Sequence, residues 1–167
     1  MVDLTSLPNK LDPKALTCRA VIETPKGRRS KYDYDPKARA FRLHSLLPDG
    51  MSFPLDFGFI PSTLCEDGDP MDVMVLSDEA SEMGALLEVR LIGVMEAEES
   101  EKGDDSERND RVLAVNCVSN LYQKVTTSTI SSRPSSTTFP SSGSRSMPWR
   151  ASASGSWACA RPARPPS

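Results

Sequence analysis

Short segments of alternating or continuous apolar positions recur through the first 125 residues of the chain. They cover residues 19–24, 30–35, 40–47, 71–77, 85–94 and 111–118. Clusters of Gly, Pro, Asp and Asn lie between them, as is typical of turns between strands. Little of the chain shows the 3.6-residue period of an amphipathic helix. The pattern therefore predicts a mainly β protein in which short strands form a small closed barrel.

Two segments of this region are predicted to be irregular. Residues 1–18, interrupted by Pro8 and Pro13, indicate an extended or briefly helical lead-in. Residues 51–61 read M-S-F-P-L-D-F-G-F-I-P, with three phenylalanines around Pro54 and Gly58. We expect this second segment to be irregular and to lie close to the core.

The composition of the chain changes after residue 125. All 23 acidic residues lie before that point, so residues 1–125 carry a net charge of −8 and residues 126–167 a net charge of +5. The second part contains 13 Ser and six Pro and has no helical or strand period. We therefore divide the chain into a β-barrel domain at 1–125 and a disordered tail at 126–167.

Several classes of protein are disfavoured by the composition. An acidic body argues against nucleic-acid binding. The four cysteines are widely spaced, without a C-x-x-C pair, which indicates neither a zinc site nor a disulfide scaffold. No apolar segment approaches membrane-spanning length, and the first residues do not form a signal peptide. We expect a soluble cytoplasmic protein that does not bind membranes.

The strongest chemical signal is the sequence E-D-G-D-P-M-D at 66–72, directly before an apolar strand. It places Asp67, Asp69 and Asp72 on one turn, where carboxylates either raise each other's pKa or hold a divalent cation. Oxygen-only ligands suit Mg²⁺ or Mn²⁺. The spacing does not fit an EF-hand loop, and the simpler alternative is a surface turn rich in Asp and Gly.

Further charges fall at the ends of predicted strands. Glu23 closes the first strand, and Lys31 and Asp33 are two positions apart on the second, so they point the same way. Arg28 and Arg29 lie between these strands. Each alone is typical of a solvated surface charge. Together with the aspartate cluster, they indicate a site that binds a polyanion through metal ions.

With these motifs the chain resembles the soluble family I inorganic pyrophosphatases. The resemblance rests on V-I-E-T-P at 21–25, S-K-Y-D-Y-D at 30–35, F-P-L-D-F-G-F-I-P-S-T at 53–63 and E-D-G-D-P-M-D-V-M-V at 66–75, and it continues through L-E-V-R-L-I-G-V at 87–94 and N-D-R-V-L-A-V at 109–115. It covers roughly residues 15–125, and D-G-D-P-x-D-V is the family's specific signature.

The resemblance implies a five-stranded OB-type closed barrel, which in the intact family is accompanied by helix as an α+β fold. It implies Mg²⁺-dependent hydrolysis of pyrophosphate to two phosphates, with Mn²⁺ as an alternative metal, and leaves a family-like homo-oligomer open. By position, the metal ligands are Asp67, Asp72 and, with a one-residue shift, Asp110. Asp69 matches the residue that helps activate the attacking water, Lys31 matches a phosphate-binding lysine, and Glu23 and Asp33 match an outer acidic shell.

The chain departs from the family pattern at several positions. Asp33 stands where many members have Glu, and Phe53 and Phe57 stand where many have Tyr. An arginine that binds substrate is expected near His44 and Ser45, neither of which has its fork of donors. His44 itself is interpreted as incidental, since metal-assisted hydrolysis does not require a histidine base.

The expected C-terminal helix is missing from the sequence. Read one nucleotide out of frame, residues 147–158 give H-A-M-E-G-K-R-F-R-V-L-G, and residues 127–131 give H-I-D-D-L, both of which resemble the family. Met147, Trp149 and Trp157 have unique codons and still fit the shifted reading. We hypothesise a single-base deletion near codon 126, with a genuine disordered tail as the alternative.

A decayed, non-catalytic OB barrel that binds a phosphorylated ligand or partner is the alternative to the enzyme, and a metal-dependent phosphoesterase with another substrate is a third reading.

Overall fold

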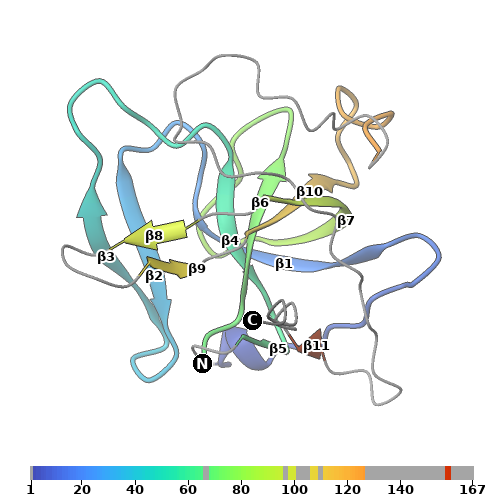
Figure 1. Ribbon diagram of the computed structural model, residues 1–167, viewed down its shortest axis with the longest axis horizontal. Helices are drawn as coiled ribbons and strands as arrows, with labels where there is room; N and C mark the ends of the chain where they lie inside the picture. The colour runs from blue at the N-terminus through green and yellow to red at the C-terminus, as the bar shows by residue number, and fades with distance from the viewer. Residues whose placement is uncertain are drawn as a thin grey trace, which may run out of the picture.

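The computed structural model describes residues 2–65, 68–95, 98–100, 106–108, 111–126 and 157–158 (Figure 1). Five strands form the closed barrel that the sequence predicts. They are β1 (Thr17–Thr24), β4 (Asp56–Ile60), β6 (Met71–Leu76), β10 (Arg111–Asn116) and β7 (Leu86–Met95), in that order around the barrel. Neighbouring strands are antiparallel except β6 and β10, which are parallel. The predicted fold class, a mainly β chain with an OB-type closed barrel, is therefore confirmed.

The interior of the barrel is filled by small and β-branched side chains from alternate strand positions. A period of two places every second side chain on the inner face of a closed sheet. The buried cluster contains Cys18, Ala20, Ile22, Ile60, Met71, Val73, Val75, Val89, Leu91, Val112 and Ala114. Burying this apolar surface is the main free-energy gain that holds the strands in register.

The prediction that residues 51–61 are irregular is wrong over their second half, which forms β4. Phe59 and Ile60 are buried in this strand, and Gly58 lies against the backbone of Val21 and Ile22 on β1. The glycine is needed because β1 and β4 approach so closely there. Because a glycine beside aromatic residues resembles a turn signal, the sequence pattern does not reveal this central strand. The contact with β1 explains why the strand contains a glycine.

A buried carboxylate joins β4 to the loops at the end of the barrel. Asp56 is fully buried and accepts hydrogen bonds from the backbone N–H of Lys26 (2.8 Å) and from the Ser81 hydroxyl (2.7 Å). The Lys26 ammonium in turn donates to the carbonyl oxygens of Ser77 and Asp78. These bonds satisfy an acid that would otherwise be costly to bury.

A long hairpin of β2 (Ser30–Asp35) and β3 (Ala40–Leu46) stands beside the barrel (Figure 1). Tyr34 connects it to the barrel, because its ring lies 6.0 Å from that of Phe59 on β4 and 5.3 Å from that of Phe41 on β3. The Thr24 hydroxyl at the end of β1 accepts a hydrogen bond from the backbone N–H of Tyr32 and donates one to its carbonyl. The hairpin is thus fixed against the outer side of β1 and β4.

The remaining elements are short. They are the 3₁₀ helix η1 (Leu4–Ser6), β5 (Thr63–Leu64) paired with β11 (Trp157–Ala158), and β8 (Glu98–Ser100) paired with β9 (Ser106–Arg108). The predicted tail at 126–167 lies outside the described residues except for positions 126, 157 and 158. In the portion of the chain that the structure covers, no helix combines the length and apolar character needed to cross a membrane.

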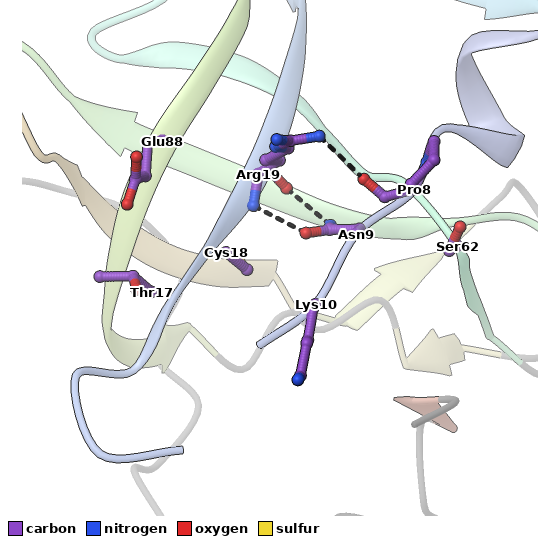
Figure 2. A pocket seen from close by; sticks show the side chains of 8 residues that line it. All are labelled: Pro8, Asn9, Lys10, Thr17, Cys18, Arg19, Ser62 and Glu88. Carbon is purple, nitrogen blue, oxygen red and sulfur yellow. Dashed lines mark hydrogen bonds between the residues drawn. The ribbon is translucent and has the colours of Figure 1, made fainter. Parts of the chain in front are cut away.

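The lead-in before β1 contains the predicted brief helix and is tied to the barrel by Asn9. The Asn9 amide donates to the carbonyl of Arg19, and its oxygen accepts from the Arg19 backbone N–H at 2.9 Å (Figure 2). The same amide also donates to the carbonyl of Pro61. A pocket lies here, lined by Pro8, Asn9, Lys10, Thr17, Cys18, Arg19, Ser62 and Glu88 (Figure 2). None of the residues predicted to carry the chemistry lines this pocket.

Candidate active site

The outer face of β6 and β10, where the two strands begin, carries two charged residues that are close in space. Asp72 and Arg111 alternate with the core residues Val73 and Val112, so their side chains point away from the interior. Parallel pairing of β6 with β10 sets Val112 opposite Val73 and thereby brings Arg111 beside Asp72. Arg111 Nε lies 3.6 Å from Asp72 Oδ2.

Two phenylalanines support the arginine. The Arg111 guanidinium lies over the ring of Phe57, 5.3 Å from its centroid, which is a cation–π arrangement. The ring of Phe53 packs edge-on against Phe57, with centroids 5.8 Å apart. Phe53 and Phe57, which stand where many family members have Tyr, therefore form an apolar support for the Arg111 guanidinium beside Asp72.

Glu23 reaches the same region from β1 through a β-bulge. Ile22 pairs with Gly58 and Thr24 with Phe57, so Glu23 is the extra residue on its strand. A bulge redirects a side chain, and bulges are frequent beside active sites. The Glu23 carboxylate accepts a hydrogen bond of 2.6 Å from the backbone N–H of Tyr34 on β2.

The surroundings of Glu23 raise its pKa to about 7, well above the ordinary value for a glutamate. Burial is the largest cause, and the negative charges of Asp33 and Asp72 add to it. The Tyr34 N–H and the Lys31 ammonium oppose the rise without cancelling it. A carboxyl group with this pKa lies near a balance between its charged and neutral forms at neutral pH, which is typical of functional sites.

Lys31 and Asp33 lie on the same face of β2, as their spacing predicts. Lys31 Nζ is 3.5 Å from Asp33 Oδ1. The other carboxylate oxygen of Asp33 contacts Nδ1 of His44, across the hairpin on β3. His44, interpreted from the sequence as incidental, therefore belongs to the charged group, and only the register of the hairpin reveals this.

The aspartate turn lies before β6. Its backbone is closed by a hydrogen bond of 2.8 Å from the Cys65 N–H to the Asp69 carbonyl, and Gly68 has a φ of 91° that favours glycine. Asp69 is exposed here. The predicted ligands Asp67 and Asp110 lie outside the described residues, and within the residues described no group of three or more His, Cys, Asp or Glu side chains has a metal-binding arrangement.

The described residues nevertheless fit a divalent cation by their charge. Asp33 and Asp72 both raise the pKa of Glu23, so negative charge accumulates between β1, β2 and β6. A bound cation is usually the largest local charge at such a place and reverses this effect on the pKa. Hard carboxylate oxygens are the ligands that Mg²⁺ and Mn²⁺ prefer.

Comparison with known proteins gives a consistent result. The family described as inorganic pyrophosphatase matches residues 20–138. The inorganic pyrophosphatase of Thermus thermophilus is 44% identical over 104 residues, which are 62% of this chain and 59% of the relative. That of Synechocystis is 36% identical over 114 residues, covering 68% and 63% of the two chains. The chain thus spans about three fifths of the length of these curated relatives.

Solved structures extend the similarity to the fold. The crystal structure of the Thermus thermophilus inorganic pyrophosphatase has a TM-score of 0.65 at 39% identity, covering 74% of this chain and 68% of that one. An inorganic pyrophosphatase from Neisseria gonorrhoeae has a TM-score of 0.66 at 30% identity, covering 77% and 73%. These proteins share the arrangement of strands that holds the charged residues described above.

Proposed function

The chain belongs to the inorganic pyrophosphatase family, and from this premise we propose that it is an inorganic diphosphatase that hydrolyses pyrophosphate to two phosphates. The observation that carries the proposal is the convergence of acids and cations on the outer face of the barrel. The charges of Asp33 and Asp72 both act on Glu23 there, Lys31 lies beside Asp33, and Arg111 lies beside Asp72. Such a site suits a substrate with several negative charges, held by cations and metal ions together.

The proposed cofactor is Mg²⁺, with Mn²⁺ as the alternative, held by Asp67, Asp72 and Asp110. When bound, a divalent cation supplies charge neutralisation at the phosphoryl oxygens and makes a water molecule more acidic. Of the three residues, Asp72 is described, and its neighbours Glu23 and Arg111 set the local charge.

The other residues have roles that follow from their chemistry. Lys31 is proposed to bind a phosphate oxygen, and Asp33 limits the freedom of the Lys31 ammonium. Asp69, at the exposed turn, is proposed to help take a proton from the attacking water. Glu23 is proposed to belong to the acidic shell at the edge of the site, where a bound cation would favour its charged form.

A phosphate-release assay on pyrophosphate, with and without Mg²⁺, tests the proposal. Lys31→Ala should weaken pyrophosphate binding by about 1.5–3 kcal/mol, the usual scale for a hydrogen bond to a charged group. Lys37→Ala is the matched control, since it removes an exposed lysine from the turn of the same hairpin. A parent chain that releases no phosphate, or equal binding by both variants and the parent, would contradict the proposal.

A second candidate is a non-catalytic OB barrel that binds a phosphorylated ligand or partner. It is favoured by the presence of His44 and Ser45 where an arginine is expected. Calorimetry separates the two, because a decayed site would bind pyrophosphate without releasing phosphate.

We also propose that the protein is soluble and cytoplasmic and acts without nucleic acid or membrane. The charge pattern supports a division into a barrel domain at 1–125 and an out-of-frame tail at 126–167. A family-like homo-oligomer stays open, and sedimentation of the chain with and without a restored reading frame would test it.

A further inference from the structure

His44 occupies an irregular position on the β2–β3 hairpin. Lys31 pairs with Ser45 and Tyr32 pairs with Leu43, so His44 is the extra residue of a β-bulge on β3. A bulged residue has no partner across the ladder, and its side chain is aimed differently from those of its neighbours. At this position the imidazole of His44 contacts Asp33, which pairs with Arg42 two residues earlier on β3.

The contact between His44 and Asp33 fixes one nitrogen of the ring. Asp33 Oδ2 is an acceptor, so the Nδ1 that it contacts carries the proton and donates. The other carboxylate oxygen, Oδ1, faces the Lys31 ammonium. One carboxylate therefore holds two potential cations side by side, and Nε2 of the ring is directed away from Asp33.

The group is accessible to a ligand. The side chains of His44, Asp33 and Lys31 are 55%, 41% and 36% exposed. Asp33 also faces Glu23 on β1, while Arg42, the nearest further cation on β3, forms an ion pair with Asp35 at 3.2 Å. The Lys31 ammonium acts on Glu23 of the barrel, and His44 contacts the same Asp33 carboxylate as Lys31 does.

We propose that His44 is a phosphate-binding residue of this chain, oriented by Asp33 and acting beside Lys31 on a diphosphate anion. This inference rests on the proposed function for the identity of the anion. The protonated ring donates through Nδ1 to Asp33 and through Nε2 to a phosphate oxygen, whereas the neutral ring has no proton left at Nε2. His44 therefore binds the anion in acid and loses this bond in base, unlike an arginine, which stays charged.

The single histidine of the chain allows a direct test by NMR. The ring signal of His44 is followed from pH 5 to 8.5, in EDTA, with and without pyrophosphate, so that neither metal nor turnover is involved. We expect pyrophosphate to move the signal and to displace its titration curve towards higher pH, because an anion favours the protonated ring. A signal and a titration curve unchanged by saturating pyrophosphate would overturn the proposal.

Calorimetry on three variants adds a second measurement. At pH 6, His44→Gln should weaken pyrophosphate binding roughly tenfold relative to the parent, and at pH 8 the two should bind alike. His44→Lys should restore binding at both pH values, since its charge persists. Lys37→Gln, which removes a cation elsewhere on the hairpin, should bind as the parent does.

The failure of this inference can be told apart from failure of the proposed function. If His44→Gln lowers the melting temperature but keeps the parent's affinity at both pH values, His44 only braces the hairpin and the inference is wrong. The hydrolysis assay with Mg²⁺ judges the proposed function separately, because it measures phosphate release by the parent chain. A parent that hydrolyses pyrophosphate while His44→Gln binds and reacts identically would refute the role of His44 alone.

Discussion

A single methyl group added at Gly58 should separate two strands of the barrel. A Cβ atom at this position would lie 1.9 Å from the carbonyl oxygen of Val21, 2.8 Å from its carbonyl carbon and 2.9 Å from Cα of Ile22. An ordinary contact between carbon and oxygen is about 3.3 Å. Because all three atoms belong to the backbone of β1, no side-chain rotation can relieve the overlap, and β1 must move away from β4 by roughly 1.4 Å.

The cost of this movement follows from the hydrogen bonds that it breaks. Val21 pairs with Phe59 and Ile22 with Gly58, and the two residues on β1 are fully buried. Two ladder bonds broken in a dry core, each at about 1–3 kcal/mol for the groups left unsatisfied, give a loss of about 2–6 kcal/mol for Gly58→Ala. That is a large part of the 5–15 kcal/mol by which a domain is normally stable, so the variant should be largely unfolded or much less resistant to urea.

Urea unfolding followed by circular dichroism measures the loss, with Gly50→Ala as the control. Gly50 has a φ of 82° and nothing within 4 Å of an added Cβ, so alanine there costs only the left-handed conformation, about 1–2 kcal/mol. Gly58→Ala should lower the free energy of unfolding by clearly more than Gly50→Ala does. Equal losses in the two variants would refute the argument that backbone contact makes Gly58 necessary.

Three other predictions concern the metal, an acid at the barrel end and the tail. Mg²⁺ at a hundred times its dissociation constant should stabilise the parent by about 2.7 kcal/mol, and Asp72→Asn should remove this gain while the barrel stays folded; equal stabilisation by calorimetry would exclude Asp72 as a ligand. Asp78 accepts hydrogen bonds from the Ser119 hydroxyl and the Asn120 N–H, which lower its pKa below 3.8. The stabilising effect of the Asp78 carboxylate is therefore fully present above pH 3.8 and is lost as the pH falls through the lowered pKa. The difference in melting temperature between the parent and Asp78→Ala should therefore narrow in acid. A difference that stays constant down to about pH 2 would contradict this prediction. Inserting one base near codon 126 should restore a helix, solubility and Mg²⁺-dependent turnover together, and an uncorrected chain that hydrolyses pyrophosphate as fast as the corrected one would refute the deletion.

The period of polar and apolar residues predicts most of the barrel. Strands were expected at 19–24, 71–77, 85–94 and 111–118, and they form β1, β6, β7 and β10 with small shifts at their ends. This succeeds because every strand of a closed barrel has one face on the core, which requires apolar residues at alternate positions. The sequence does not predict β4, because Gly58 within it is explained by the close approach of β1 and not by the segment's own pattern.

Some features of the candidate site likewise follow from the sequence, and others follow only from the tertiary structure. The sequence alone identified Glu23, Lys31, Asp33, Asp69 and Asp72 as candidates and placed Lys31 and Asp33 on one face, since that relation depends on spacing within one strand. The tertiary structure decided that Arg111 lies beside Asp72 and over Phe57, that the pKa of Glu23 is raised to about 7, and that His44 joins Asp33. These relations depend on strand order, on burial and on the pairing of β2 with β3, and two β-bulges lie among the residues involved, at Glu23 and at His44. A bulge is one extra residue whose position is fixed only when the strand meets its partner, so no period within a single segment can reveal it.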